Sequence, residues 1–177
     1  MYLWIGCKLP ETFEKTLRRY CLKKNEAIGL NTQPFSLPQH ISLKISFDAG
    51  PQYAQILSWL THRLSQESAF SVHLLPPERM ENILWLPVAE SPRLMALHQM
   101  LDVQLQQLFS IPQHPFDREF LFHSTLFMDE DVEKLTQMES ALSNLSIPES
   151  LQIDTFLLGI SEDGKTNIQI ARTIQLI

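Results

Sequence analysis

Two segments of the chain alternate between apolar and polar residues with the period of a β-strand. The first runs from Gln39 to Phe47, and its apolar positions are Ile41, Leu43, Ile45 and Phe47. The positions between them are His40, Ser42, Lys44 and Ser46. Because successive side chains of a strand point to opposite faces, the pattern predicts one buried face and one polar face.

The second alternating segment runs from Phe120 to Met128. Its predicted buried face holds Phe122, Ser124, Leu126 and Met128, and its other face holds His123, Thr125 and Phe127. Each segment therefore carries a His and, two positions later on the same face, a hydroxyl residue. At the usual rise per residue the two side chains lie roughly 7 Å apart along the strand.

Helical periodicity, proline and glycine divide the rest of the chain. Pro10 opens a predicted helix that ends before Gly29, and Pro51 opens another. Ser91 and Pro92 are typical of a helix N-cap and first turn, and an acidic first turn at 129–131 opens a fourth helix that runs to about residue 145. The third helix has an apolar stripe made of Leu94, Leu97, Leu101, Leu105 and Leu108. Further strands are expected over 2–9, 70–75, 83–88, 151–160 and 166–177, the last two forming a hairpin with a turn at 161–164.

The two halves of the chain show the same order of predicted elements. Each has a helix, a proline-containing loop, a His strand, a second helix and then two strands. Pro10 and Pro92 lie 82 residues apart, and His40 and His123 lie 83 apart. We therefore predict one domain over 1–177 with duplicated halves of about 10–90 and 91–177. The expected fold is α+β, with two pseudo-symmetric lobes whose antiparallel sheets carry helices outside and whose His strands face a central groove.

Composition limits the class of ligand. The net charge of −6 argues against a general nucleic-acid binder, because such affinity comes mainly from Lys and Arg that neutralise phosphates. We expect a small nucleotide or RNA-end substrate and no extended nucleic-acid surface. Cys7 and Cys21 lack a metal-type spacing and are expected to be buried thiols of a reducing compartment. There is no long apolar run, so we expect a cytoplasmic protein, without membrane contact and monomeric.

The His segments resemble a known motif. His40-Ile41-Ser42-Leu43 and His123-Ser124-Thr125-Leu126 are similar to the two His-x-Thr/Ser copies of the two-histidine (2H) phosphoesterase superfamily, which includes bacterial RNA 2',3'-cyclic phosphodiesterases and 2'-5' RNA ligases. The segment from Arg118 to His123 also resembles the Arg-x-Phe-x-x-His lead-in of some members. Ser42 stands where Thr is common in the family. The resemblance covers nearly the whole chain in the order of its elements.

The resemblance implies a metal-independent hydrolase that acts on 2',3'-cyclic phosphate or 2'-5' linkages. His40 and His123 would supply the acid and the base, in an order that the sequence leaves open. Ser42 and Thr125 would hydrogen-bond the non-bridging phosphate oxygens. Two alternatives stay open: a phosphoesterase of another small cyclic or signalling nucleotide, and a non-catalytic module that binds phosphate ends.

Four further residues are candidates for substrate binding. Lys44 and Arg118 offer cations near the His residues, with a solvated Lys and a surface salt bridge as the alternatives. Trp85 and Phe127 offer rings that can stack on a base, with core packing as the alternative. The other four histidines (His62, His73, His98 and His114) match no metal-ligand spacing and are expected to be surface or structural. The acidic run at 129–131 is expected to cap a helix. We predict neither a metal nor another cofactor.

Overall fold

The computed structural model describes residues 1–164 and 167–177. The helices are α1 (Glu11–Ile28), α2 (Tyr53–Leu64), α3 (Pro92–Phe109) and α4 (Val132–Ala141). The strands are β1 (Tyr2–Lys8), β2 (His40–Asp48), β3 (Phe70–Val72), β4 (Glu78–Met80), β5 (Ile83–Pro87), β6 (His123–Met128), β7 (Leu151–Ile153), β8 (Thr155–Ser161) and β9 (Gln169–Gln175). Short 3-10 segments occur at η1 (Gln33–Ser36), η2 (Gly50–Gln52) and η3 (Pro115–Asp117).

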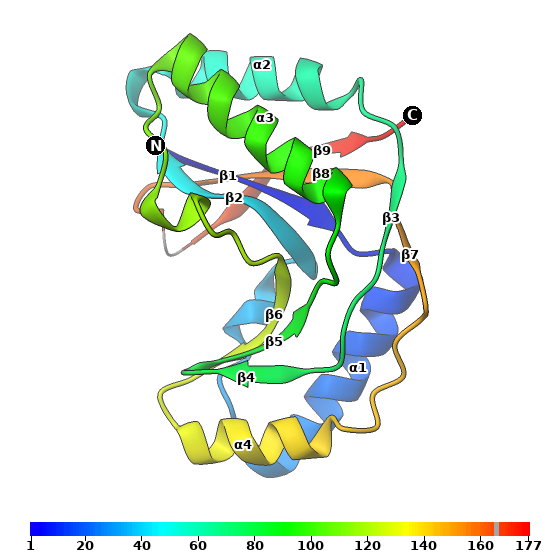
Figure 1. The fold of residues 1–177 in the computed structure, drawn as a ribbon. Coiled ribbons are helices and arrows are strands. Elements are labelled where there is room, and N and C mark those ends of the chain that lie inside the picture. Colours follow the sequence, from blue (N-terminus) through cyan, green and yellow to red (C-terminus); the bar gives the residue numbers. More distant parts are fainter. Residues whose placement is uncertain (165–166) are drawn as a thin grey trace.

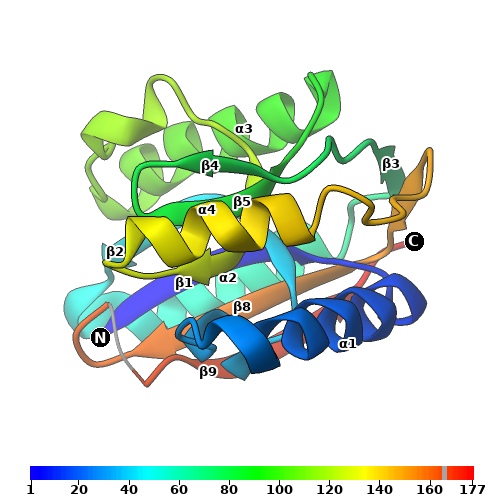
Figure 2. The ribbon, with the colours of Figure 1, turned by 90° about the horizontal axis from the view of Figure 1, so that it is seen from below.

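These strands form two main sheets in which every pairing is antiparallel. One sheet has the order β2-β1-β8-β9 and the other has the order β4-β5-β6. In Figure 1, α2 and α3 lie beyond the first sheet, whereas α1 and α4 lie beyond the second. Figure 2 shows α1 and α4 side by side, and these two helices are in contact. The predicted α+β architecture of two lobes with helices outside is confirmed.

The two halves of the chain follow nearly the same series of elements. The first series is β1-α1-η1-β2-η2-α2-β3-β4, and the second, which has no counterpart of η2, is β5-α3-η3-β6-α4-β7-β8. The equivalent short strands β3 and β7 pair with each other, with Ser71 opposite Gln152. The final strand of each series pairs with the first strand of the other, β4 with β5 and β8 with β1. The duplication stays a prediction, and this series favours β1 and β5 as the first elements of its halves.

Local signals explain where the helices begin and end. Gly29 follows α1 with a φ of 76°, in the left-handed region that glycine adopts without strain. Ser91 Oγ accepts the backbone N–H of Leu94 at 3.3 Å, and Asp131 accepts that of Lys134 at 3.0 Å. The predicted capping roles of Ser91 and of the acidic run are confirmed.

A β-bulge interrupts each His strand at the same place. In β2 the register passes from Gly6 opposite Ser42 to Ile5 opposite Lys44, which leaves Leu43 as an extra residue. In β6 it passes from Trp85 opposite Thr125 to Leu84 opposite Phe127, which leaves Leu126 extra. A bulge shifts the alternation of the residues that follow it, and in β2 a second register shift, between the pairs Ile5–Lys44 and Leu3–Phe47, returns Phe47 to the buried face. The predicted burial of Ile45 and Met128 is therefore wrong, since Ile45 is half-buried and Met128 is exposed.

Other differences from the sequence prediction concern boundaries. The helix predicted over 129–145 covers only Val132–Ala141, and Leu108 is 58% exposed instead of closing the apolar stripe. Residues 151–160 divide into β7 and β8, and β4 was not predicted. The hairpin of β8 and β9 is present, although Thr166, the predicted start of its second strand, lies outside the described residues.

Cys7 and Cys21 are both buried free thiols, as predicted. Burial raises the pKa of the Cys21 thiol to about 12 and raises that of Cys7 well above its usual value. Among the helices of the described residues, none combines the length and the apolar character that a membrane span requires.

Candidate active site

The two His residues lie at the starts of β2 and β6, strands of different lobes that contact each other. His40 Nδ1 is 2.7 Å from the carbonyl oxygen of Pro38, and His123 Nδ1 is 2.7 Å from that of Leu121. A carbonyl only accepts hydrogen bonds, so each ring donates from Nδ1 to the residue two positions earlier. The second nitrogen, Nε2, is therefore the one that can accept or give a proton in each half-buried ring.

Burial shapes the titration of both rings. It lowers the pKa of His40 to about 4, against the raising effect of the Pro38 carbonyl, and the nearby charge of His123 lowers it further. Burial also lowers the pKa of His123, again opposed by its carbonyl partner. Both imidazoles are therefore neutral in the free protein at neutral pH.

The two hydroxyl residues precede the bulges and keep the face of their histidines. Ser42 Oγ accepts a hydrogen bond from Trp4 Nε1 at 3.3 Å. Thr125 lies directly opposite Trp85 in the β5–β6 register. Both hydroxyl residues are half-buried. The arrangement of one His and one hydroxyl residue per strand, as predicted, is present in both lobes.

A tryptophan from the neighbouring strand packs on each His. The Trp4 and His40 ring centroids are 4.4 Å apart with planes at 73°, and those of Trp85 and His123 are 4.1 Å apart with planes at 40°. Trp85 is only 5% exposed and donates from Nε1 to Glu78 Oε1 at 3.1 Å. With Glu78 and Leu121 it lines a surface hollow of about 380 Å³. Stacking of Trp85 on a base stays a prediction.

The proposed role of Lys44 in substrate binding is wrong. Its side chain is 1% exposed and forms ion pairs with Asp102, at 2.6 Å, and with Asp117. The bulge at Leu43 turns Lys44 away from the His40 face and toward α3, so the alternative of a solvated Lys is wrong as well. The lysine serves the packing of α3 against β2.

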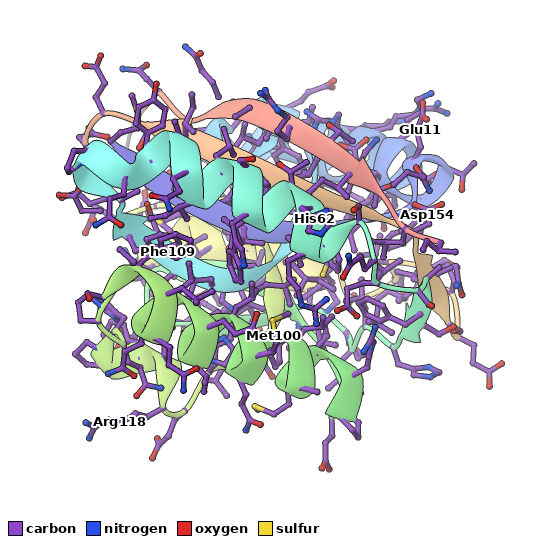
Figure 3. All side chains as sticks on the ribbon, turned by 90° about the horizontal axis from the view of Figure 1, so that it is seen from above. Glu11, His62, Met100, Phe109, Arg118 and Asp154 are labelled. Carbon is purple, nitrogen blue, oxygen red and sulfur yellow. The ribbon has the colours of Figure 1, made fainter. Side chains whose placement is uncertain are left out.

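The other bulge explains the second correction. Phe127 follows the bulge at Leu126, is fully buried and packs against Phe35 with centroids 5.3 Å apart. Phe127 is therefore a core residue and cannot stack on a substrate. Arg118 is exposed, and Figure 3 shows its side chain pointing outward from the edge of the molecule. No ion pair joins Arg118 within the described residues, and its role in binding stays a prediction.

One buried cluster has a composition that could hold a metal. His98, Asp102 and Asp117 each offer a ligand atom, and these atoms all lie within 4.8 Å of one another. The Lys44 ammonium already contacts both carboxylates at this point. The His98 ring is also bonded to two carbonyl oxygens, those of Leu43 and Asp117. A lysine cation therefore takes the place that a metal would need, and His98 has the structural role predicted for it.

Three residues that contact the site were not predicted. Trp4 packs on His40, and Gln39 Oε1 accepts a hydrogen bond at 3.0 Å from Ser124 of the other lobe. Gln39 and Ser124 are each 1% exposed. Gln39 directly precedes His40 and Ser124 directly follows His123, and this adjacency is the one sequence feature that could have pointed to the two residues. The pairing itself depends on contact between lobes, which no local pattern reveals.

The comparisons with known proteins agree with this geometry. The sequence profile of the 2'-5' RNA ligase superfamily matches residues 32–165, which is more than half of the chain. No curated protein sequence matches the chain.

Solved structures share the fold across nearly the whole chain. The E. coli LigT structure complexed with 3'-AMP has a TM-score of 0.68 at 19% identity, covering 98% of this chain and 97% of LigT. A structure described as a phosphoesterase has a TM-score of 0.67 at 19% identity, covering 98% and 97%. The protein TT0787 of Thermus thermophilus has a TM-score of 0.66 at 19% identity, covering 99% and 97%. With two His strands in two matching lobes and a superfamily match that spans both, this chain belongs to the 2'-5' RNA ligase superfamily of two-histidine phosphoesterases.

Proposed function

We propose that the chain is a metal-independent phosphodiesterase that opens 2',3'-cyclic phosphates or 2'-5' linkages of nucleotides or short RNA. The observation that carries the proposal is the matched geometry of His40 and His123. Each ring donates Nδ1–H to a backbone carbonyl at 2.7 Å and keeps Nε2 for proton transfer. Two imidazoles from opposite lobes suit a reaction that needs a base on one side of phosphorus and an acid on the other.

The reaction is a hydrolysis in which a water oxygen bonds to phosphorus. One imidazole takes the proton of this water, and the bond from phosphorus to a ribose oxygen breaks. The other imidazole gives its proton to that leaving oxygen. General acid and base catalysis of this kind contribute about 10²- to 10⁴-fold each.

The environments of the two rings favour His40 as the base. Burial lowers its pKa to about 4, so it is neutral and ready to accept a proton. His123 occupies the more exposed position of the two, where a proton is more easily held. An anionic phosphate between the rings raises the pKa of both, and His123 then carries the proton for the leaving oxygen.

Ser42 and Thr125 would stabilise the charge that develops on the non-bridging oxygens. Each hydroxyl lies two residues after a His on the same strand face. Donors aimed at such oxygens contribute most when they are fixed before the reaction starts.

A mononucleotide or short oligonucleotide fits the charges of the chain. The net charge of −6 repels a long polyanion, and with Lys44 buried, Arg118 is the remaining candidate cation named from the sequence. LigT of E. coli holds 3'-AMP in one structure and ATP in another. A ligand of nucleotide size is therefore the one that we propose. Location in the cytoplasm and a monomeric state stay predictions.

Turnover tests the proposal against its alternatives. The protein is incubated with 2',3'-cyclic AMP, 2'-5' dinucleotides and cyclic dinucleotides, and products are identified by mass. We expect hydrolysis of the first two. Hydrolysis of cyclic dinucleotides alone would favour a phosphoesterase of another signalling nucleotide. Binding of these compounds without turnover of any would favour a non-catalytic module that recognises phosphate ends.

A further inference from the structure

The indole of Trp4 is held in one position beside Ser42. Its strand, β1, lies between β2 and β8, and the ring packs over two glycines, Gly6 of β1 and Gly159 of β8. A Cβ built on Gly6 would lie 2.7 Å from the Trp4 ring, and one built on Gly159 would lie 2.6 Å from it. Trp4 is 7% exposed. The two glycines therefore form a slot that the indole fills, since a Cβ at either position would overlap the ring.

The fixed indole controls the hydrogen bonding of Ser42. Trp4 Nε1 donates to Ser42 Oγ at 3.3 Å, and an indole N–H can only donate. This bond occupies one lone pair of the serine oxygen. Within the described residues Ser42 Oγ has no acceptor for its own proton, which is therefore free for an oxygen of the substrate.

The other lobe orients its hydroxyl by a different means. Trp85 lies opposite Thr125, but its indole N–H donates a hydrogen bond to Glu78 Oε1 at 3.1 Å. Thr125 does not need that proton, because a β-branched side chain is stiff about χ1. Serine lacks the methyl group that supplies this stiffness, so Ser42 would rotate without Trp4. The two lobes thus fix equivalent hydroxyls by branching in one case and by an indole in the other.

We propose that Trp4 is a positioning residue that holds Ser42 Oγ as a hydrogen-bond donor toward the reacting phosphate. The inference rests on the proposed function, since it assigns Trp4 a part in the same reaction. It goes beyond that function because it states that Ser42 can act in catalysis only when Trp4 holds its hydroxyl in place.

The test is kcat and KM for 2',3'-cyclic AMP in a set of paired variants. Trp4→Phe keeps a ring in the slot and removes the N–H, and we expect kcat to fall about 3- to 10-fold, the effect of one hydrogen bond. In a Ser42→Ala background the same substitution should have no further effect. In a Ser42→Thr background its cost should disappear, because the added methyl group fixes the hydroxyl. If Trp4→Phe costs the same in all three backgrounds, Trp4 acts through packing alone and the proposal is overturned.

Trp85→Phe is the matched control, because it truncates the corresponding ring but breaks a bond to a carboxylate. Its effect should be the same with and without Thr125→Ala. If Trp4→Phe does not fold, the hydrogen exchange of the Trp4 indole N–H is measured by NMR in the wild type and in Ser42→Ala. Faster exchange in Ser42→Ala supports the contact, and unchanged exchange overturns the proposal. If the wild type shows no turnover, the proposed function is overturned. The exchange measurement tests the Trp4–Ser42 contact separately, because it does not depend on turnover.

Discussion

Gln39 and Ser124 join the two lobes by a hydrogen bond of 3.0 Å, directly beside the two histidines. Ser124 Oγ donates to Gln39 Oε1, and Gln39 Nε2 donates in turn to the carbonyl of Pro34 at 3.3 Å. Since Gln39 precedes His40 and Ser124 follows His123, we expect this bond to hold the two imidazoles at a fixed separation. In-line transfer depends on that distance, because a shift of about 1 Å in such a geometry can cost roughly 10²-fold in rate.

The bond between Gln39 and Ser124 predicts a coupled effect on kcat. Ser124→Ala and Gln39→Leu should each lower kcat by about 3- to 10-fold, the effect of one hydrogen bond, with a smaller change in KM. The double variant should lose much less than the product of the two. Ser71→Ala is a suitable control, because Ser71 bonds Gln152 between β3 and β7, a pair of short strands that also joins the two halves of the chain. Independent effects at Gln39 and Ser124 would show that the bond does not set the catalytic distance.

Lys44 is predicted to matter for stability and not for substrate binding. Lys44→Met leaves two carboxylates without their buried cation, which costs about 3–5 kcal/mol of unfolding free energy. Adding Asp102→Asn and Asp117→Asn should restore much of the loss. Lys23→Met, on the exposed surface of α1, should change stability by less than about 0.5 kcal/mol. Urea unfolding checks these values. A Lys44→Met protein of normal stability with a raised KM would show instead that Lys44 binds the substrate.

The pH dependence of kcat/KM follows from the lowered pKa values of both histidines. The base, His40, loses activity when it is protonated, below about pH 4. The acid, His123, must hold a proton, and burial lowers its pKa from the usual 6.5. The cyclic phosphate stays a monoanion over this range, so the profile should be a bell whose maximum lies between about pH 4 and 6.5. A maximum at or above pH 7 would contradict this assignment of base and acid.

Activity should survive removal of metal ions. The described residues bring metal-ligating atoms together at His98, Asp102 and Asp117, where the Lys44 ammonium already contacts both carboxylates. Turnover of 2',3'-cyclic AMP should therefore be unchanged after incubation with excess chelator. If chelation abolishes turnover and added Mg²⁺ or Zn²⁺ restores it, the two-imidazole mechanism is wrong.

The sequence predicts the lobes and the His strands well because both depend on local patterns. Alternation identifies β2 and β6, and the repeated order of elements suggests their equivalence. The bulges at Leu43 and Leu126 do not follow from such patterns, because each arises from pairing with a neighbouring strand. For this reason His40 and Thr125, which precede the bulges, lie on the expected face. The predictions for Lys44 and Phe127, which follow the bulges, are wrong.

Contacts between distant segments account for the remaining misses. Trp4 lies 38 residues before Ser42 in the chain, and Ser124 lies 85 residues after Gln39. Both contacts use ordinary residues at ordinary positions of a strand. Only the packing of β1 beside β2, and of β2 against β6, makes them part of the site.

The most direct test of the account is the kinetic effect of removing the two imidazoles, alone and together. His40→Ala and His123→Ala should each lower kcat for 2',3'-cyclic AMP by at least about 10²-fold while the proteins stay folded. The double variant should lose much less than the product of the two effects, because the two groups act in one step. A folded single variant that keeps near-normal kcat would contradict the claim that His40 and His123 act as the acid and base of this protein.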